Sequence, residues 1–145
     1  MATSAWRLYR KAKGRMITDL NLESDVFRLH LYRTGSNCTD LSHSTKASLT
    51  NEVTANQAGY TQSGITLSGG LVTVSGSVVK FDLTDLVITA SGGDMTGVRF
   101  AVVEHSDFPF MYTEMSTAGF DVTSGNTLTI SPAASGVFEL TGGET

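Results

Sequence analysis

The feature that most constrains the fold is a series of short strand-like segments in the second half of the chain. They recur about every ten residues, and Gly-Gly or Ser-Gly pairs separate many of them. The segments are LVTVS (71–75), VVKFDL (78–83), LVITA (86–90), GVRFAVVE (97–104), PFMYTEM (109–115), TLTIS (127–131) and GVFEL (136–140). This rhythm favours antiparallel strands over alternating β/α units. It predicts a mainly β chain with an antiparallel β-sandwich or jelly-roll-like domain.

Three of these segments carry more specific predictions. Residues 71–83 predict a hairpin that turns at Ser75-Gly76-Ser77. The continuously apolar residues 86–90 predict a central strand. In the segment 97–104, alternation places three apolar side chains on one face: Val98, Phe100 and Val102.

An earlier segment, VFRLHLYR (26–33), has the alternation of a half-buried strand. One face would carry Phe27, Leu29 and Leu31, and the other Arg28, His30 and Tyr32. Residues 40–50 are compatible with either a short helix or an irregular loop.

The segment SAWRLYRKAKGRMI (4–17) predicts a single N-terminal helix. Apolar and aromatic side chains fall at helical spacing on one stripe: Ala5, Leu8, Tyr9, Ala12 and Met16. Ser4 would cap the start of the helix, and Gly14 would weaken or end it. We therefore divide the chain into a basic N-terminal helix or arm (1–20) and a β-sandwich domain (21–145).

Charge is segregated along the chain. Residues 1–15 carry five basic groups and no acid, whereas the remainder has a net charge of −9. One interpretation is that Arg7, Arg10, Lys11 and Arg15 dock the helix onto an acidic partner, with Trp6 or Tyr9 as an aromatic anchor. The partner would be an acidic protein surface or, less expected, nucleic acid. A second, compatible interpretation is that the helix packs its apolar stripe on its own sandwich and solvates its charges.

The stretch TNEVTANQAGYTQSGITLSGG (50–70) is rich in small and polar residues and contains no His, Cys, Lys or Arg. Alternation of Tyr60, Ile65 and Leu67 around small residues predicts a short strand at the edge of a sheet. A flat edge without basic charge would be an aggregation hazard if left bare. We therefore expect this edge to bind a neighbouring chain in a homo-oligomer. A trimer is the first expectation.

Candidates for catalysis or metal binding are sparse. His30, His43 and His105 do not stand at zinc-ligand spacing from one another or from Cys38. Cys38 and His43 are five positions apart, but nothing in the sequence orients them as a thiol–histidine pair.

The remaining candidates also give no reason to expect catalysis or metal binding. Asp82 and Asp85 are better explained as turn-capping residues than as an acid/base or cation-binding pair. No P-loop, dinucleotide fingerprint or nucleophile elbow is present. We expect no enzymatic activity, no cofactor and no bound metal.

Several stretches together resemble a family of small virion structural proteins of tailed bacteriophages. The most specific is the family's LTNEV…GYT signature, matched by residues 49–53 and by Gly59-Tyr60-Thr61…Gly64-Ile65-Thr66-Leu67. A second element is matched by Phe81, Asp85 and the Ala-Ser-Gly-Gly of residues 90–93. This chain has Val87-Ile88 where the family commonly has an aromatic residue.

The resemblance implies a non-enzymatic particle component, assembled in the bacterial cytoplasm and located in the virion. The single cysteine agrees with synthesis in a reducing compartment. Head decoration, with the major capsid protein or another virion structural protein as partner, is the first expectation. A tail, collar or fibre-associated position is second, and a host-surface carbohydrate-binding module third. No run of apolar residues is long enough to predict a membrane span.

Overall fold

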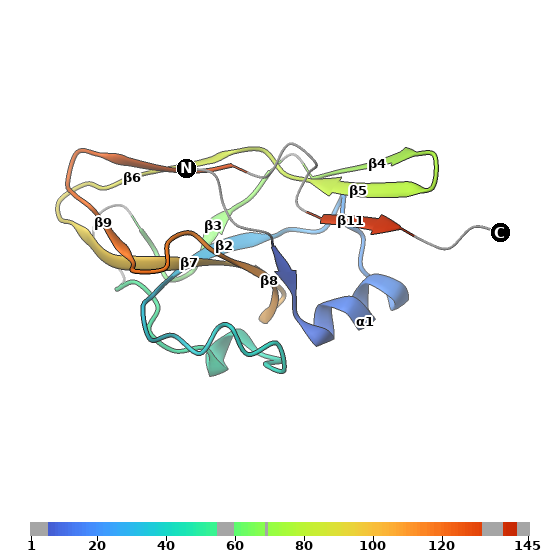
Figure 1. Ribbon diagram of the computed structural model, residues 1–145, viewed down its shortest axis with the longest axis horizontal. Coiled ribbons are helices and arrows are strands. Elements are labelled where there is room, and N and C mark those ends of the chain that lie inside the picture. The colour runs from blue at the N-terminus through green and yellow to red at the C-terminus, as the bar shows by residue number, and fades with distance from the viewer. Residues whose placement is uncertain (1–5, 55–59, 69, 132–137, 142–145) are drawn as a thin grey trace.

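A computed structural model describes residues 6–54, 60–68, 70–131 and 138–141 of the chain. The described part is mainly β, with antiparallel sheets and one α-helix near the N-terminus (Figure 1). The predicted class, a β-sandwich-like fold with an N-terminal helix, is confirmed.

The largest sheet has the strand order β1-β8-β7-β2-β3, and β9 also pairs with β7. Every strand pair in it is antiparallel. The long strand β7 and its neighbour β2 form its centre. Its strands are β1 (Arg7–Leu8), β2 (Arg28–Arg33), β3 (Ile65–Thr66), β7 (Met95–His105), β8 (Phe108–Glu114) and β9 (Phe120–Val122).

Two smaller sheets contain the remaining strands. The first pairs β6 (Leu86–Thr89) with β10 (Thr127–Ile130). The second has the order β11-β5-β4, built from β4 (Leu71–Ser75), β5 (Val78–Asp82) and β11 (Phe138–Thr141). The register of β4 and β5 confirms the predicted hairpin, with Gly76 and Ser77 as its two-residue turn.

Apolar side chains cover both faces of the central strands. On one face, Leu29 and Leu31 of β2 share a buried cluster with Ile88 of β6 and Leu128 of β10. In Figure 1 the β6 and β10 ribbons lie over the large sheet as a second layer. On the other face, Tyr32, Phe100 and Tyr112 cluster with Tyr9 and Ala12 from the N-terminal segment.

The prediction that β2 is half-buried is therefore wrong. His30 and Tyr32 are 1% and 0% exposed, although they lie on the face that alternation assigned to solvent. The N-terminal segment and the residues after β2 cover that face. Alternation along one strand cannot report what covers its polar face.

The predicted face of β7 is wrong at one position. Val98 packs with Leu29 and Leu31, whereas Phe100 and Val102 belong to the opposite cluster. The pairing of β2 with β7 skips Arg99, because Tyr32 is opposite Phe100 and Arg33 is opposite Val98. This bulge adds one residue to β7 and reverses the alternation.

The prediction of a central strand at 86–90 is also wrong. Within the described residues, β6 pairs only with β10. Ile88 is buried, but Val87 is 58% exposed. By contrast, the short edge strand expected within 50–70 is confirmed, since β3 lies at the end of the large sheet beside β2.

The helix α1 spans Arg10–Thr18 and begins later than predicted. Arg7 and Leu8 form β1 instead, paired with Tyr112 and Met111 of β8. The amide of Tyr9 then donates to the carbonyl of Phe110. These sheet hydrogen bonds hold the backbone extended in a sequence with helical spacing. The predicted cap Ser4 lies outside the described residues.

The ambiguous segment 40–50 contains one short 3₁₀ turn, Lys46–Ser48, in an otherwise irregular stretch. None of the helices in the described part of the chain has the length and apolar character needed to cross a membrane.

Candidate functional site

The strongest concentration of buried polar chemistry surrounds His30 on β2. Nδ1 of His30 lies 2.8 Å from Oε1 of Glu52, and Nε2 hydrogen-bonds to Oε2 of Glu104. Glu52 also accepts hydrogen bonds from Nζ of Lys46 and from the hydroxyl of Tyr60, each at 2.6 Å. We call these residues, His30, Lys46, Glu52, Tyr60 and Glu104, the His30 cluster.

Distant parts of the chain hold this cluster in place. His30 and Glu104 come from the neighbouring central strands β2 and β7, where His30 is opposite Val102 and Glu104 is opposite Arg28, so the two side chains are diagonal neighbours across the pair. Glu52 is fixed by an antiparallel bridge to Tyr32. The hydroxyl of Tyr60 accepts a hydrogen bond from the amide of Leu31, at 3.0 Å.

The electrostatics of the cluster favour an ionised Glu52. Burial raises the pKa of Glu52, but the hydrogen bonds from His30, Lys46 and Tyr60 outweigh burial, so its pKa lies below the ordinary value. Burial and the contact with Glu52 raise the pKa of Tyr60, which keeps its hydroxyl protonated. Tyr60 therefore donates to Glu52 while it accepts from Leu31.

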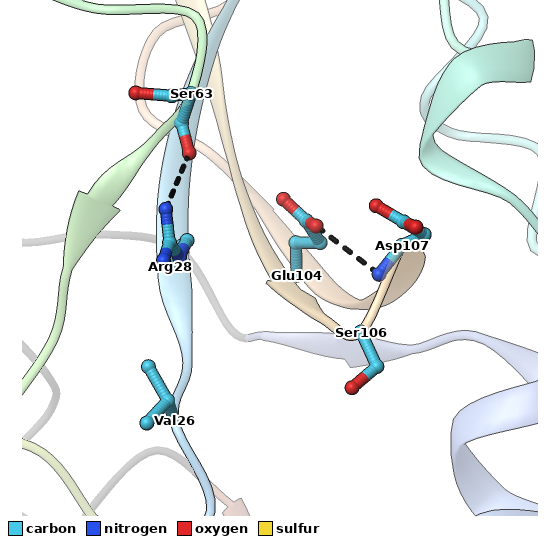
Figure 2. Close-up of a pocket in the computed structure, with 6 residues that line it drawn as sticks. All are labelled: Val26, Arg28, Ser63, Glu104, Ser106 and Asp107. Carbon is cyan, nitrogen blue, oxygen red and sulfur yellow. Dashed lines mark hydrogen bonds between the residues drawn. The ribbon is translucent and has the colours of Figure 1, made fainter.

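An open pocket of about 410 Å³ borders the cluster at Glu104. Figure 2 shows its lining: Val26, Arg28, Ser63, Glu104, Ser106 and Asp107. Most of its polar groups are already engaged. Arg28 donates to the carbonyl of Ser63 at 3.2 Å, and Oε1 of Glu104 accepts from the amide of Asp107 at 3.2 Å.

The pocket does not present an assembled catalytic set. Within the described residues, neither Ser63 nor Ser106 hydrogen-bonds to a histidine or a carboxylate. The two nitrogens of His30 face different carboxylates, so His30, Glu52 and Glu104 do not converge on one point. The described residues contain no group of three or more His, Cys, Asp or Glu side chains arranged to hold a metal ion.

The other histidines have separate partners. Nδ1 of His43 lies 2.8 Å from Oγ of Ser48, a pair that sequence analysis missed. Ser48 also donates to the carbonyl of Thr45 at 2.7 Å, so its proton does not point at His43. His105 pairs with Asp25, at 3.3 Å. Cys38 is buried, and burial raises its pKa to about 11, which suits an inert thiol.

The contacts of Asp82 agree with the predicted turn-capping role. Oδ1 of Asp82 accepts from the amide of Leu83 at 2.8 Å, as expected for side-chain capping. No hydrogen bond or ion pair joins Asp85 to Asp82 in the described structure.

The predicted docking residues of the N-terminal segment divide into two groups. Tyr9 is fully buried and its hydroxyl donates to the carbonyl of Cys38, and Trp6 is half-buried between the two apolar clusters. Lys11 and Arg15 lie over the ring of Phe108, at 5.2 and 5.4 Å from its centroid. The second interpretation of the basic helix, packing on its own sheet, therefore describes these four side chains.

The outward face of α1 is different. Arg10, Lys13 and Ile17 are exposed at positions i, i+3 and i+7 of the helix, and Ile17 is 87% exposed. Within the described residues, the side chains of Arg10 and Lys13 form no hydrogen bond or ion pair. We call these three residues the α1 outward face. Arg7 of β1 is also exposed.

In the segment 50–70, the predicted contact residues pack inside their own chain. Tyr60 is 1% exposed, and Ile65 and Leu67 are half-buried against the apolar clusters. Residues 55–59 and 69 of this segment lie outside the described residues. The described side chains thus support folding of this chain more directly than contact with another one.

Comparison of the chain with models of known protein families, with curated proteins and with solved structures finds no match.

Proposed function

We propose that this chain is a non-enzymatic structural protein of a tailed-phage virion, and that it binds an acidic surface of the particle through the α1 outward face. The observation that carries the proposal is the arrangement of Arg10, Lys13 and the 87%-exposed Ile17 on one helix face. An exposed apolar side chain beside two cations on the same helix face suits an interface with an acidic protein. Such an interface combines apolar burial with charge complementarity.

The sequence resemblance to small virion structural proteins supports the same proposal. The expected partner is the major capsid protein in a decorated head, with a tail or collar protein as the alternative. Surface ion pairs contribute only about 0–1 kcal/mol each, so one copy would bind weakly. Many copies linked on a shell would convert weak contacts into stable attachment.

Point variants test this proposal better than truncation. Removing residues 1–15 would delete Tyr9 and Ala12, which are fully buried, so the protein would lose part of its core. Arg10→Gln with Lys13→Gln removes two charges from exposed positions. Ser77→Glu with Ser91→Glu lowers the net charge by the same amount at exposed positions elsewhere, and serves as the matched control.

The measurement is cosedimentation with particles of the source phage assembled without this protein. We expect the Arg10/Lys13 variant to lose most binding and the control to bind normally, with the same circular dichroism and melting temperature. Added salt should weaken binding of the wild-type protein to the particles, because exposed charges are screened within ~10 Å at 0.1 M. Equal binding by both variants would contradict the proposal.

Electron microscopy of the loaded particles would separate the alternatives. Density over the head lattice supports decoration, and density at the neck or tail supports the second position. Binding of the wild-type protein to mixed-sequence duplex DNA at the same salt would instead indicate a nucleic-acid partner.

A further inference from the structure

The hydrogen bonds of the His30 cluster depend on one particular proton, the second ring proton of His30. Both ring nitrogens of His30 face carboxylate oxygens, of Glu52 and of Glu104. An ionised carboxylate only accepts hydrogen bonds, and an imidazole donates from both nitrogens only when it is protonated. The geometry is complete when His30 is an imidazolium.

The charges of the cluster lead to the same state. With His30 protonated, two cations, His30 and Lys46, balance two anions, Glu52 and Glu104. Without that proton, a lone pair of the ring would face a carboxylate oxygen at hydrogen-bonding distance, and the cluster would carry one uncompensated negative charge. His30 is 1% exposed and its two partners are 12% and 11% exposed at their side chains, so water would screen this charge poorly.

The cluster also joins two parts of the chain. Glu104 belongs to the central strand β7, whereas Lys46, Glu52 and Tyr60 lie in the stretches that cover the end of β2. We define the covering segments as residues 46–54 and 60–67. Besides the cluster, a few hydrogen bonds fasten them to β2, including the amide of Val53 to the carbonyl of Leu31 at 2.9 Å.

We propose that His30 is a buried imidazolium that clamps the covering segments to the central strands, and that loss of its proton releases them. The device is a proton-dependent fastening of the fold, independent of the proposed docking function. Neutral His30 would satisfy Glu52 or Glu104, but not both.

Other titratable groups surround the cluster. On β2, Arg28 is exposed and bonds to Ser63, and the buried hydroxyl of Tyr32 has no hydrogen-bond partner among the described residues. On β7, His105 pairs with Asp25. The backbone amide of Asp107, in the turn after β7, donates a hydrogen bond to Glu104. Among these described groups, only Glu52 and Glu104 hydrogen-bond to the ring of His30.

The test uses the full-length protein labelled with ¹⁵N in its histidines. Ring ¹⁵N shifts report the protonation of His30, and hydrogen exchange reports protection of the amides in the covering segments. We expect two protonated ring nitrogens in the folded protein. As pH rises through the His30 transition, protection of Val53 and Leu67 should fall by about tenfold or more, relative to amides of the β7–β8 pair.

Glu104→Gln provides a sharp second measurement. A glutamine amide donates to the unprotonated Nε2, while Nδ1–H of a neutral His30 still donates to Glu52. This variant should keep the covering segments protected and remove the pH dependence. Glu114→Gln, which changes the same residue type on β8 beside Arg99, should retain the wild-type pH dependence.

Three results would overturn the proposal. The first is a neutral His30 with a single ring N–H throughout the folded range. The second is covering-segment protection that stays constant while His30 titrates. The third is a Glu104→Gln protein that keeps the wild-type dependence on pH.

Discussion

Gly64 lies directly against the imidazole of His30, so that a Cβ on Gly64 would be 2.7 Å from Nε2 of His30. This approach helps to seal the buried ring. Gly64 also has φ +88°, a left-handed conformation that L side chains rarely adopt. Both the contact and the backbone require glycine here.

We expect Gly64→Ala to lower the free energy of unfolding by about 2–4 kcal/mol, from backbone strain and overpacking together. Gly92→Ala is the matched control, because Gly92 has φ +77° but no atom within 4 Å of its Cβ position. That control should lose only about 1–2 kcal/mol. Urea denaturation measures both. Equal losses would show that the contact with His30 does not matter.

His30→Ala should lower the free energy of unfolding by about 3–5 kcal/mol, because it leaves Glu52 and Glu104 buried without their shared partner. His43→Ala removes a more accessible histidine with one hydrogen bond to Ser48, and should lose about 1 kcal/mol or less. Guanidinium denaturation of both variants gives the comparison. A loss for His30→Ala no larger than that for His43→Ala would contradict the role assigned to the cluster.

Stability should fall in acid, in part through Glu52. Its pKa in the folded protein is below the ordinary value of 4.5, so its contribution is fully present above that pH and is lost as pH falls through the lowered pKa. Thermal unfolding between about pH 3 and pH 6 should therefore show a smaller pH dependence for Glu52→Gln than for the wild type. Identical slopes would mean that Glu52 is not stabilised as the carboxylate.

Lys11 and Arg15 should stabilise the fold through Phe108, which is 1% exposed beneath them. Replacing both with alanine should lower the free energy of unfolding by about 1–2 kcal/mol, through lost cation–π contact and lost cover. Lys13→Ala, on the outward face of the same helix, should change stability by less than about 0.5 kcal/mol. If Lys13→Ala were as destabilising as the double variant, the helix would pack differently.

Local patterns predicted much of the fold. The hairpin of β4 and β5 follows from a two-residue turn between alternating strands, which requires only neighbouring residues. The strands β8 and β10 lie where the ten-residue rhythm of strand-like segments placed them. The helical stripe of the N-terminal segment predicted the start of the helix too early. Arg7 and Leu8 pair with β8, so the helix begins only at Arg10.

The cluster around His30 could not be found in this way. His30 reads locally as a solvent-facing residue of an alternating strand, and no motif links it to its partners. A buried polar side chain becomes visible only when the elements that cover it are known.

By itself, the sequence determined the β class, the position of the hairpin and the segregation of basic from acidic residues, since each depends on spacing or composition within a short stretch. Only the tertiary structure decided that β2 is buried on both faces, that a bulge places Val98 on the opposite face of β7 from Phe100, and that two carboxylates contact His30. Those carboxylates, Glu52 and Glu104, are 22 and 74 positions from His30 along the chain. Sheet pairing and loop packing bring them together, and this long-range pairing buries a histidine that the local pattern placed at the surface.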